Sequence, residues 1–177
     1  MLKRNPHHVI LYPLNAEEIG WLIQGREKLE KKLGLSSIPF DVSGDESFLQ
    51  KFEINLKTHH LPWVKESGDS FKWFTHWLII DQSINVAVGG ISLNSLDGSI
   101  SQLEMSYFVN VRYENHGYAG EACQILMHWI HTEKRPVEII ADTEIRSFAS
   151  QKILKKNGFQ IRLQSGNIIR WSRVFIG

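Results

Sequence analysis

The chain has 177 residues, of which 42% are hydrophobic and 22% are charged, and its formal net charge is +1 at pH 7. These values are ordinary for a globular protein and exclude a disordered or fibrous class. The length fits one domain, so we expect a single domain over residues 1–177. So small a net charge supplies no broad basic field, and nucleic acid is not expected as a partner.

The only cysteine, Cys123, cannot form an internal disulfide, which favours a reducing compartment and predicts a cytoplasmic location. We expect it to be a packed thiol rather than a nucleophile. The apolar run at 9–12 stops at Pro13, too early for a signal-peptide core, and no run has the length of a membrane span. A membrane partner is therefore not expected. The oligomeric state stays open, with a homodimer as one alternative.

The first part of the sequence predicts a strand and a long helix. Residues 9–14 are typical of a strand. Asn15 followed by Glu18 forms a capping-box pattern, so a helix should begin there and end at Gly34, with Gly25 as a weak point inside it.

A second helix is expected from an Asp45 cap to the step before Pro62, because four apolar residues between them recur at helical spacing. The two helices should form one lobe. The rest of the chain alternates β-rich segments with two helices, predicted at about 118–131 and 148–156. The predicted strands are 73–80, 86–93, 102–109, 137–141, 158–163 and 168–175.

The stretch 107–122 passes from a strand through a short loop directly into a helix. Unpaired amides at a helix N-terminus point outward and the helix dipole favours negative charge, so Asn115 through Gly120 can hold a pyrophosphate. Gly117 lets the backbone come close to a ligand. Taken alone, this junction is equally well explained as a structural turn.

Four separated segments together resemble the GNAT superfamily of acetyl-CoA-dependent N-acetyltransferases, nearest to its ribosomal-protein-alanine acetyltransferase branch. They are Val88-Gly89-Gly90-Ile91, Glu104-Met105-Ser106-Tyr107, Gly117-Tyr118-Ala119-Gly120-Glu121-Ala122 and the run from Ala149 to Phe159. The resemblance implies an α/β (α+β) fold: a mixed, largely antiparallel sheet of six to seven strands, splayed at its centre and flanked by about four helices.

The resemblance further implies transfer of an acetyl group from acetyl-CoA to a primary amine, on a protein N-terminus or a small molecule, by direct attack. It implies an acetyl-CoA site built largely from main-chain groups. The expected positions are Tyr107, Phe108, Val109, Val111, Asn115, His116, Gly117, Tyr118, Ala119, Gly120, Ser147, Ser150 and Lys152. A lysine such as Lys152 on a helix is also explained as part of a solvated face.

Glu114, Asn115 and Ser147 depart from the family pattern, and Leu154 stands where many relatives carry a tyrosine that protonates the departing thiolate. These departures keep a second function open. In that alternative the protein is a non-catalytic acyl-CoA-binding sensor or scaffold.

An amine must lose a proton before it attacks, because alkylammonium groups titrate near pH ~10. Glu104 is the candidate catalytic base, since strand alternation lets it point away from Met105 toward the cleft; the alternative is an ordinary surface carboxylate. The backbone amide of Phe108 or Val109, beside a strand bulge, is expected to stabilise the negative charge on the thioester oxygen.

Other conspicuous side chains have simpler explanations. Three histidine pairs lack a third ligand at a recognisable spacing, so no metal is expected; they are His7-His8, His59-His60 and His128 with His131. Among the tryptophans, Trp63 and Trp73 are the candidates for substrate contact, against a role in the core.

Overall fold

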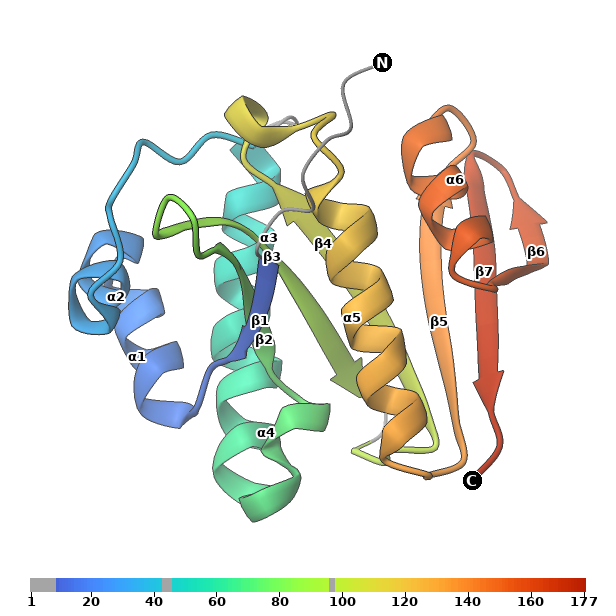
Figure 1. The fold of residues 1–177 in the computed structure, drawn as a ribbon. Coiled ribbons are helices and arrows are strands. Elements are labelled where there is room, and N and C mark those ends of the chain that lie inside the picture. Colours follow the sequence, from blue (N-terminus) through green and yellow to red (C-terminus); the bar gives the residue numbers. More distant parts are fainter. Residues whose placement is uncertain (1–8, 43–45, 96–97) are drawn as a thin grey trace.

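Seven strands form one sheet, in the order β1-β2-β3-β4-β5-β7-β6, in the computed structural model, which describes residues 9–42, 46–95 and 98–177 (Figure 1). The strands are β1 (Val9–Pro13), β2 (His76–Asp81), β3 (Val86–Ser95), β4 (Gln102–Val109), β5 (Val137–Glu144), β6 (Gln160–Ser165) and β7 (Ile168–Phe175). Only β4 and β5 pair in parallel; all other neighbours are antiparallel. The predicted mixed, largely antiparallel sheet is confirmed.

The sheet splits between β4 and β5. The two strands pair only from Gln102 to Glu104, opposite Glu138 to Ile140, while β4 stays paired with β3 up to Val109 and β5 stays paired with β7 up to Glu144. Beyond the paired segment the two ribbons diverge (Figure 1). The predicted central splay is therefore confirmed, and Glu104 lies at the branch point.

The described residues contain six α-helices rather than about four. They are α1 (Ala16–Gln24), α2 (Arg26–Leu33), α3 (Glu46–Asn55), α4 (Leu61–Glu66), α5 (Tyr118–Thr132) and α6 (Phe148–Lys156). One π-helical turn, η1 (Leu56–His60), and two 3-10 turns, η2 (Gly68–Trp73) and η3 (Val111–Tyr113), complete the set. Within the described ranges, no helix combines the length and apolarity needed to cross a membrane.

The first predicted helix is two helices in the structure. Its capping box forms as expected: the Asn15 side chain accepts from the amide of Glu18, whose carboxylate accepts from the amide of Asn15. Gly25 takes a φ of 141°, which only glycine adopts readily, and the chain turns there before α2 begins. Gly34 ends α2 in the left-handed conformation, as predicted.

The second predicted helix does not stop before Pro62. The π turn η1 joins α3 to α4, with the amide of Leu61 donating to the carbonyl of Leu56, and Pro62 lies in the first turn of α4. Proline is tolerated there because its missing N–H is not needed by the first turn. The predicted cap, Asp45, lies outside the described residues.

The later strands and helices match the predicted ranges to within a few residues. The exception is Trp73, predicted to start a strand, which lies in the 3-10 turn η2; β2 begins at His76. Trp73 is buried against Trp129 of α5, with ring centroids 4.6 Å apart, so its tertiary contacts determine its local conformation.

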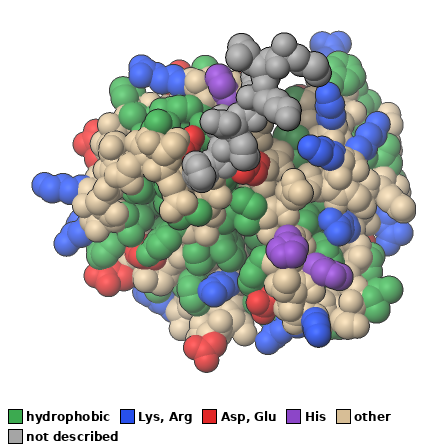
Figure 2. Space-filling view, in the orientation of Figure 1, with side chains coloured by type: hydrophobic (Ala, Val, Ile, Leu, Met, Phe, Trp, Pro, Cys, Tyr) green, Lys and Arg blue, Asp and Glu red, His purple; other side chains and the backbone are tan. Residues whose placement is uncertain are grey.

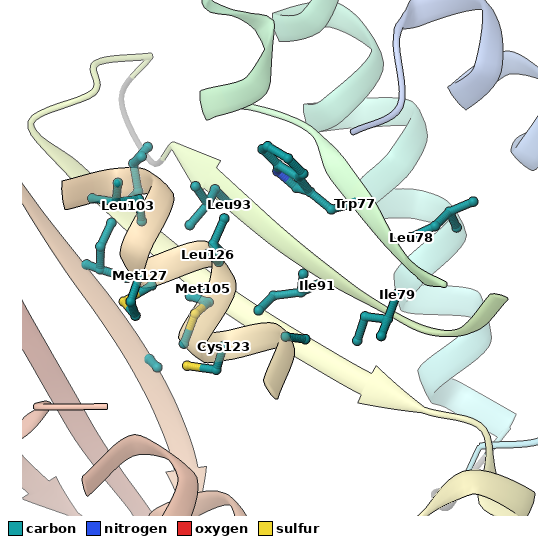
Figure 3. Close-up of a cluster of buried hydrophobic side chains, with 14 of the residues drawn as sticks. Trp77, Leu78, Ile79, Ile91, Leu93, Leu103, Met105, Cys123, Leu126 and Met127 are labelled. Atoms are coloured by element: carbon teal, nitrogen blue, oxygen red, sulfur yellow. The ribbon is translucent and has the colours of Figure 1, made fainter. Parts of the chain in front are cut away.

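Helices α5 and α6 cover one face of the sheet and α3 lies behind it (Figure 1). On the α5 face, Ile91 and Leu93 of β3 and Leu103 and Met105 of β4 pack against Cys123 and Leu126 of α5, all at most 3% exposed (Figure 3). Because alternate residues of a strand point to opposite faces, the intervening side chains point away from α5. Those side chains are Ser92, Asn94, Glu104 and Ser106.

Candidate active site

The edge of β4 that faces the split carries main-chain groups of alternate residues. The Asn110 amide donates to the Val88 carbonyl at 2.8 Å, which fixes the hydrogen-bonding phase of the β3–β4 ladder. In an antiparallel ladder the main-chain groups of every second residue hydrogen-bond to the same neighbouring strand. The Phe108 amide, two residues before that of Asn110, therefore faces β3, while the amides of Tyr107 and Val109 face β5. Of the two amides considered for oxyanion stabilisation, only that of Val109 faces the split.

The expected bulge is not in β4. The β3–β4 register is continuous from Gly89 opposite Val109 to Ser95 opposite Leu103. The irregularity lies between β2 and β3, where Val88 is the extra residue. The bulge therefore lies in β3, next to the end of β4. It does not by itself turn an amide of β4 toward the split.

The Phe108 side chain belongs to the face opposite α5. Its ring lies 5.1 Å from that of Phe52 and stacks at 5.6 Å on His76, with Phe40 and Phe48 at its edges. Phe108 thus packs within an aromatic cluster, and neither its amide nor its ring faces the β4–β5 split.

The start of α5 has the geometry of an anion site. Gly117 precedes the helix with φ of 95° and ψ of −3°, and as a glycine it offers the first turn no capping side chain. A Cβ placed on Gly117 would meet no atom of the described residues within 4 Å, so the loop is open to them on that side. Asn115 has φ of 60°, the left-handed conformation that its family counterpart, a glycine, adopts readily and that asparagine tolerates. The loop therefore keeps the same backbone conformation although Asn115 replaces the family's glycine.

Two neighbours shape this loop. His116 is exposed, and its Nδ1 lies 2.6 Å from the carbonyl oxygen of Glu114. The Tyr118 side chain is buried, and its hydroxyl donates to Asp81 Oδ2 at 2.6 Å, which ties the start of α5 to the end of β2. Burial and the Asp81 carboxylate raise the pKa of Tyr118. Tyr118 therefore faces the loop with its main chain only.

Val111 does not belong to the open edge of β4. It lies in η3, where its amide donates to the Asp41 carbonyl at 2.8 Å and its carbonyl accepts from the Glu114 amide at 3.2 Å. Its side chain is 41% exposed. Both main-chain groups of Val111 are thus engaged, and the edge available to a ligand ends at Val109.

Glu104 is half-buried at the branch point, directly opposite Asn94 of β3 and Ile140 of β5. Burial raises the pKa of its carboxyl group, the negative charge of Asp142 raises it further, and Arg170 opposes both. Asp142 and Arg170 form a two-point ion pair at 2.7 and 2.8 Å. Glu104 therefore combines access to the split with a pKa closer to neutrality than an ordinary surface glutamate.

Helix α6 closes the other side of the split. Ser147 precedes this helix without a side-chain cap, and the carbonyl of Ser150 accepts from the Tyr107 hydroxyl at 3.5 Å. Burial raises the pKa of Tyr107 to about 12. Lys152 is exposed, whereas Leu154 is fully buried in the core and has no proton to donate.

Sequence reasoning missed Asn94 and Asp142, which lie on the same face as Glu104. Each is distant from Glu104 in sequence, and only strand pairing brings them together. The one local signal is an asparagine near the end of a largely apolar strand. The tryptophan candidates pack instead: Trp73 on Trp129, and Trp63 on Phe74 at 6.1 Å.

A separate groove of about 800 Å³ lies between the second half of α5, the end of α6 and β7. It is lined by His128, His131, Lys156, Arg162 and Arg173 among others, and by none of the predicted site residues. Figure 2 shows His side chains beside Lys and Arg on this face. Over the described ranges, no three His, Cys, Asp or Glu side chains converge as metal ligands. Cys123 is buried, which raises its pKa to about 12 and confirms a packed thiol.

Comparisons with known proteins identify the family. YjdG, an uncharacterized N-acetyltransferase of Bacillus subtilis (strain 168), is 29% identical over 108 residues, or 61% of this chain and 63% of that protein. The match thus spans less than two thirds of that relative.

Among solved structures, the ribosomal-protein-S5-alanine acetyltransferase from Vibrio fischeri superposes with a TM-score of 0.62 at 14% identity, covering 98% of this chain and 97% of that one. RimL, a ribosomal L7/L12 alpha-N-protein acetyltransferase solved with coenzyme A, gives the same four values. At such identities these structures establish a shared fold. The family model described as "Acetyltransferase (GNAT) domain" matches residues 9–160, and the chain belongs to the GNAT acetyltransferase family.

Proposed function

We propose that this protein transfers an acetyl group from acetyl-CoA to a primary amine by direct attack. The observation that carries the proposal is the split between β4 and β5, with the start of α5 after Gly117 at its open end and Glu104 at its branch point. Family membership supports it, as does the coenzyme A bound to RimL, which shares the fold. The acceptor class includes protein N-termini and small-molecule amines.

The chain would hold acetyl-CoA mainly with its backbone. The first-turn amides of α5, together with the open loop at Gly117, suit a diphosphate, because they point along the helix dipole toward the anion. The amides of Tyr107 and Val109, which face the split, suit the amide-bearing arm, which can pair with β4 as an added strand. When bound, acetyl-CoA supplies an activated thioester.

Glu104 would act as the general base. Its carboxylate accepts a proton from the acceptor ammonium, directly or through water, and its raised pKa makes it a stronger base than a solvated glutamate. The Val109 amide faces the split and would donate to the oxygen that gains charge during attack. Together these two groups supply proton removal and oxyanion stabilisation.

Tyr107 is our candidate for returning a proton to the departing thiolate. The family's usual position in α6 holds the buried Leu154, whereas the Tyr107 hydroxyl reaches across the split to the Ser150 carbonyl. A phenol with a pKa of about 12 stays protonated at neutral pH and can donate. Tyr107→Phe should therefore slow turnover and leave the affinity for acetyl-CoA unchanged; loss of that affinity would contradict this role.

Coenzyme binding is tested by thermal unfolding with and without acetyl-CoA. A ligand that binds only the folded state raises the melting temperature. Gly117→Ala should reduce that rise, because a side chain is strained at this φ and occupies the open loop. Gly166→Ala is the matched control, since Gly166 also has a positive φ and open surroundings but lies in the β6–β7 turn. Equal reductions in both variants would reject the proposed diphosphate site.

Turnover is tested by release of the free CoA thiol with a panel of amines, including peptides with different N-termini, polyamines and aminoglycosides. Thiol release that depends on an amine supports the transferase. A clear acetyl-CoA thermal shift without thiol release on any amine would instead support the non-catalytic acyl-CoA sensor. No thermal shift at millimolar acetyl-CoA would contradict both functions.

A further inference from the structure

We propose that the Asn94 side chain, together with Glu104, forms the seat of the acceptor's ammonium group, and that Asn94 holds one N–H of the amine through its oxygen. The seat lies on the face of the sheet opposite α5. This inference rests on the proposed function and adds a residue that positions and selects the acceptor.

Strand pairing puts the two side chains next to each other. Asn94 of β3 and Glu104 of β4 are directly opposite partners in the antiparallel ladder. Directly opposite side chains have Cβ atoms about 4.5–5.5 Å apart. Leu93 and Leu103, their chain neighbours, both point to α5 (Figure 3). Asn94 and Glu104 therefore share the other face, at the place where the sheet begins to split.

Asn94 has an unused hydrogen-bond acceptor. Its side chain is only 8% exposed, and its Oδ1 atom has no hydrogen-bond partner in the described part of the chain. Buried side-chain oxygens are normally paired, because an unpaired one loses its bonds to water without replacement. Ser92, two residues earlier on the same face, shows the normal pattern, since its hydroxyl lies 2.7 Å from Nδ1 of His76. We therefore assign to the Oδ1 atom of Asn94 a hydrogen-bond donor that comes from a bound ligand.

The charges around this place favour a cationic donor. Glu104 supplies a carboxylate, and Asp142 is close enough to raise the pKa of Glu104. Arg170, the cation that lowers the pKa of Glu104, is already held by Asp142 at two points. A primary ammonium has three N–H donors, so it can bond to Asn94 Oδ1 and to Glu104 at once. An anionic acceptor would have no donor for Asn94 and would face two carboxylates.

The seat also orders the proton transfers. Glu104 takes one proton from the ammonium: an N–H bond breaks and an O–H bond forms, leaving the electron pair on nitrogen. Asn94 accepts a hydrogen bond from a second N–H of the amine. This bond orients the nitrogen's electron pair away from Asn94. After the C–N bond forms and the C–S bond breaks, the nitrogen loses one more proton, which balances the proton gained by the thiolate. Asn94 itself gains and loses none.

The experiment compares Asn94→Leu and Asn94→Asp with the unchanged protein, using a cationic alkylamine and an arylamine that is neutral at pH 7. Leucine removes the acceptor oxygen at similar volume. We expect its KM for the alkylamine to rise at least tenfold, with a smaller change in kcat and an unchanged acetyl-CoA thermal shift. Aspartate keeps an oxygen and adds charge, so it should restore a low KM for the alkylamine but give no such gain with the arylamine.

Ser92→Ala is the control, because Ser92 lies on the same strand and face but its hydroxyl is already paired with His76. It should lower stability without raising the KM for the alkylamine. An equal rise in KM for Ser92→Ala and Asn94→Leu would overturn the inference. Should Asn94→Leu fail to fold, Asn94→Asp decides: a KM for the alkylamine well above that of the unchanged protein contradicts the seat.

Calorimetric titration of the alkylamine into CoA-bound protein separates this inference from the proposed function, since it needs no turnover. Tenfold weaker binding to Asn94→Leu supports the seat even if no thiol is released by any amine, in which case only the transferase proposal fails. Equal binding by both proteins, or no amine binding by the unchanged protein, overturns the seat whether or not thiol is released.

Discussion

The two faces of β3 and β4 differ sharply, although they are formed by alternate residues of the same strands. Toward α5 the side chains are apolar and buried, as Ile91, Leu93, Leu103 and Met105 show (Figure 3). On the opposite face the same strands carry Ser92, Asn94, Glu104 and Ser106, with buried His76 on β2 beside them.

This difference separates stability from chemistry. The α5 face loses apolar surface to the core and holds the strands in place. The opposite face contains a carboxyl group with a raised pKa and a buried amide oxygen without a partner among the described residues. The buried His76 of β2 and His60 of η1, which have lowered pKa values, lie beside it. Truncation of the buried apolar side chains on the first face should therefore change unfolding, and substitution of Asn94, Glu104 or the histidines on the second should change turnover or pH dependence.

The largest expected effect is that of Glu104→Gln on turnover. Removing a general base should lower kcat/KM at neutral pH by roughly 10²–10⁴-fold, while the acetyl-CoA thermal shift and the urea midpoint stay close to those of the unchanged protein. In the unchanged protein kcat/KM should fall as pH drops below the raised pKa of Glu104, because the protonated acid is no base. Similar rates for both proteins across pH would remove Glu104 as the base.

On the α5 face, Leu126→Ala should have the opposite signature. Leu126 is fully buried between α5 and the sheet, and such a truncation typically costs about 2–5 kcal/mol of unfolding free energy. Urea titration followed by circular dichroism measures the loss. The kcat of the folded protein should change little, since Leu126 faces neither the split nor Glu104. A large fall in kcat without a loss of stability would break the separation of the two faces.

The buried histidines should make stability depend on pH. Burial lowers the pKa of His60 from 6.5 to about 4, outweighing its hydrogen bond to the Phe74 carbonyl. The unfolded state therefore binds a proton first as pH falls, so stability is lost between about pH 6.5 and 4. The shift corresponds to about 3 kcal/mol. Urea midpoints measured from pH 7 to 4.5 should fall less steeply for His60→Gln; identical slopes would exclude His60 as a source.

The smallest effect concerns the charges around Glu104. Asp142→Asn removes a negative charge that raises the pKa of Glu104 and frees Arg170 from its partner, and both changes lower that pKa. The acid limb of the pH profile of kcat/KM should therefore move to lower pH.

Glu138→Gln is the matched control for Asp142→Asn, because Glu138 also lies on β5 and pairs with an arginine, Arg162. It should leave the acid limb in place. Movement of the limb in both variants, or in neither, would show that Asp142 does not act specifically on Glu104.

Much of this fold is predictable because its signals are local. The capping box of Asn15 and Glu18 and the glycine stop at Gly34 are contained in a few residues each, and both form as predicted. Two predictions were wrong: one continuous helix through Gly25, and a helix that ends before Pro62. Sequence pattern alone does not show whether neighbouring elements tolerate a helix break or a π turn.

The site was less predictable than the fold. The open loop at Gly117 has a local signal, and in the structure Gly117 precedes α5 in the left-handed conformation. The use of the Val111 amide by Asp41 and the burial of Tyr118 on Asp81 depend on segments about 40–70 residues away, and no local pattern reveals them.

The sequence by itself determined the order of strands and helices, the glycine-containing turn before α5 and the face of β4 on which Glu104 lies, because periodicity and capping act over a dozen residues or fewer. Only the tertiary structure decided which amides of β4 face β5, how far β4 and β5 pair, and that Asn94 stands opposite Glu104. Strand register joins residues far apart in the chain, and it is set when side chains on both faces pack together.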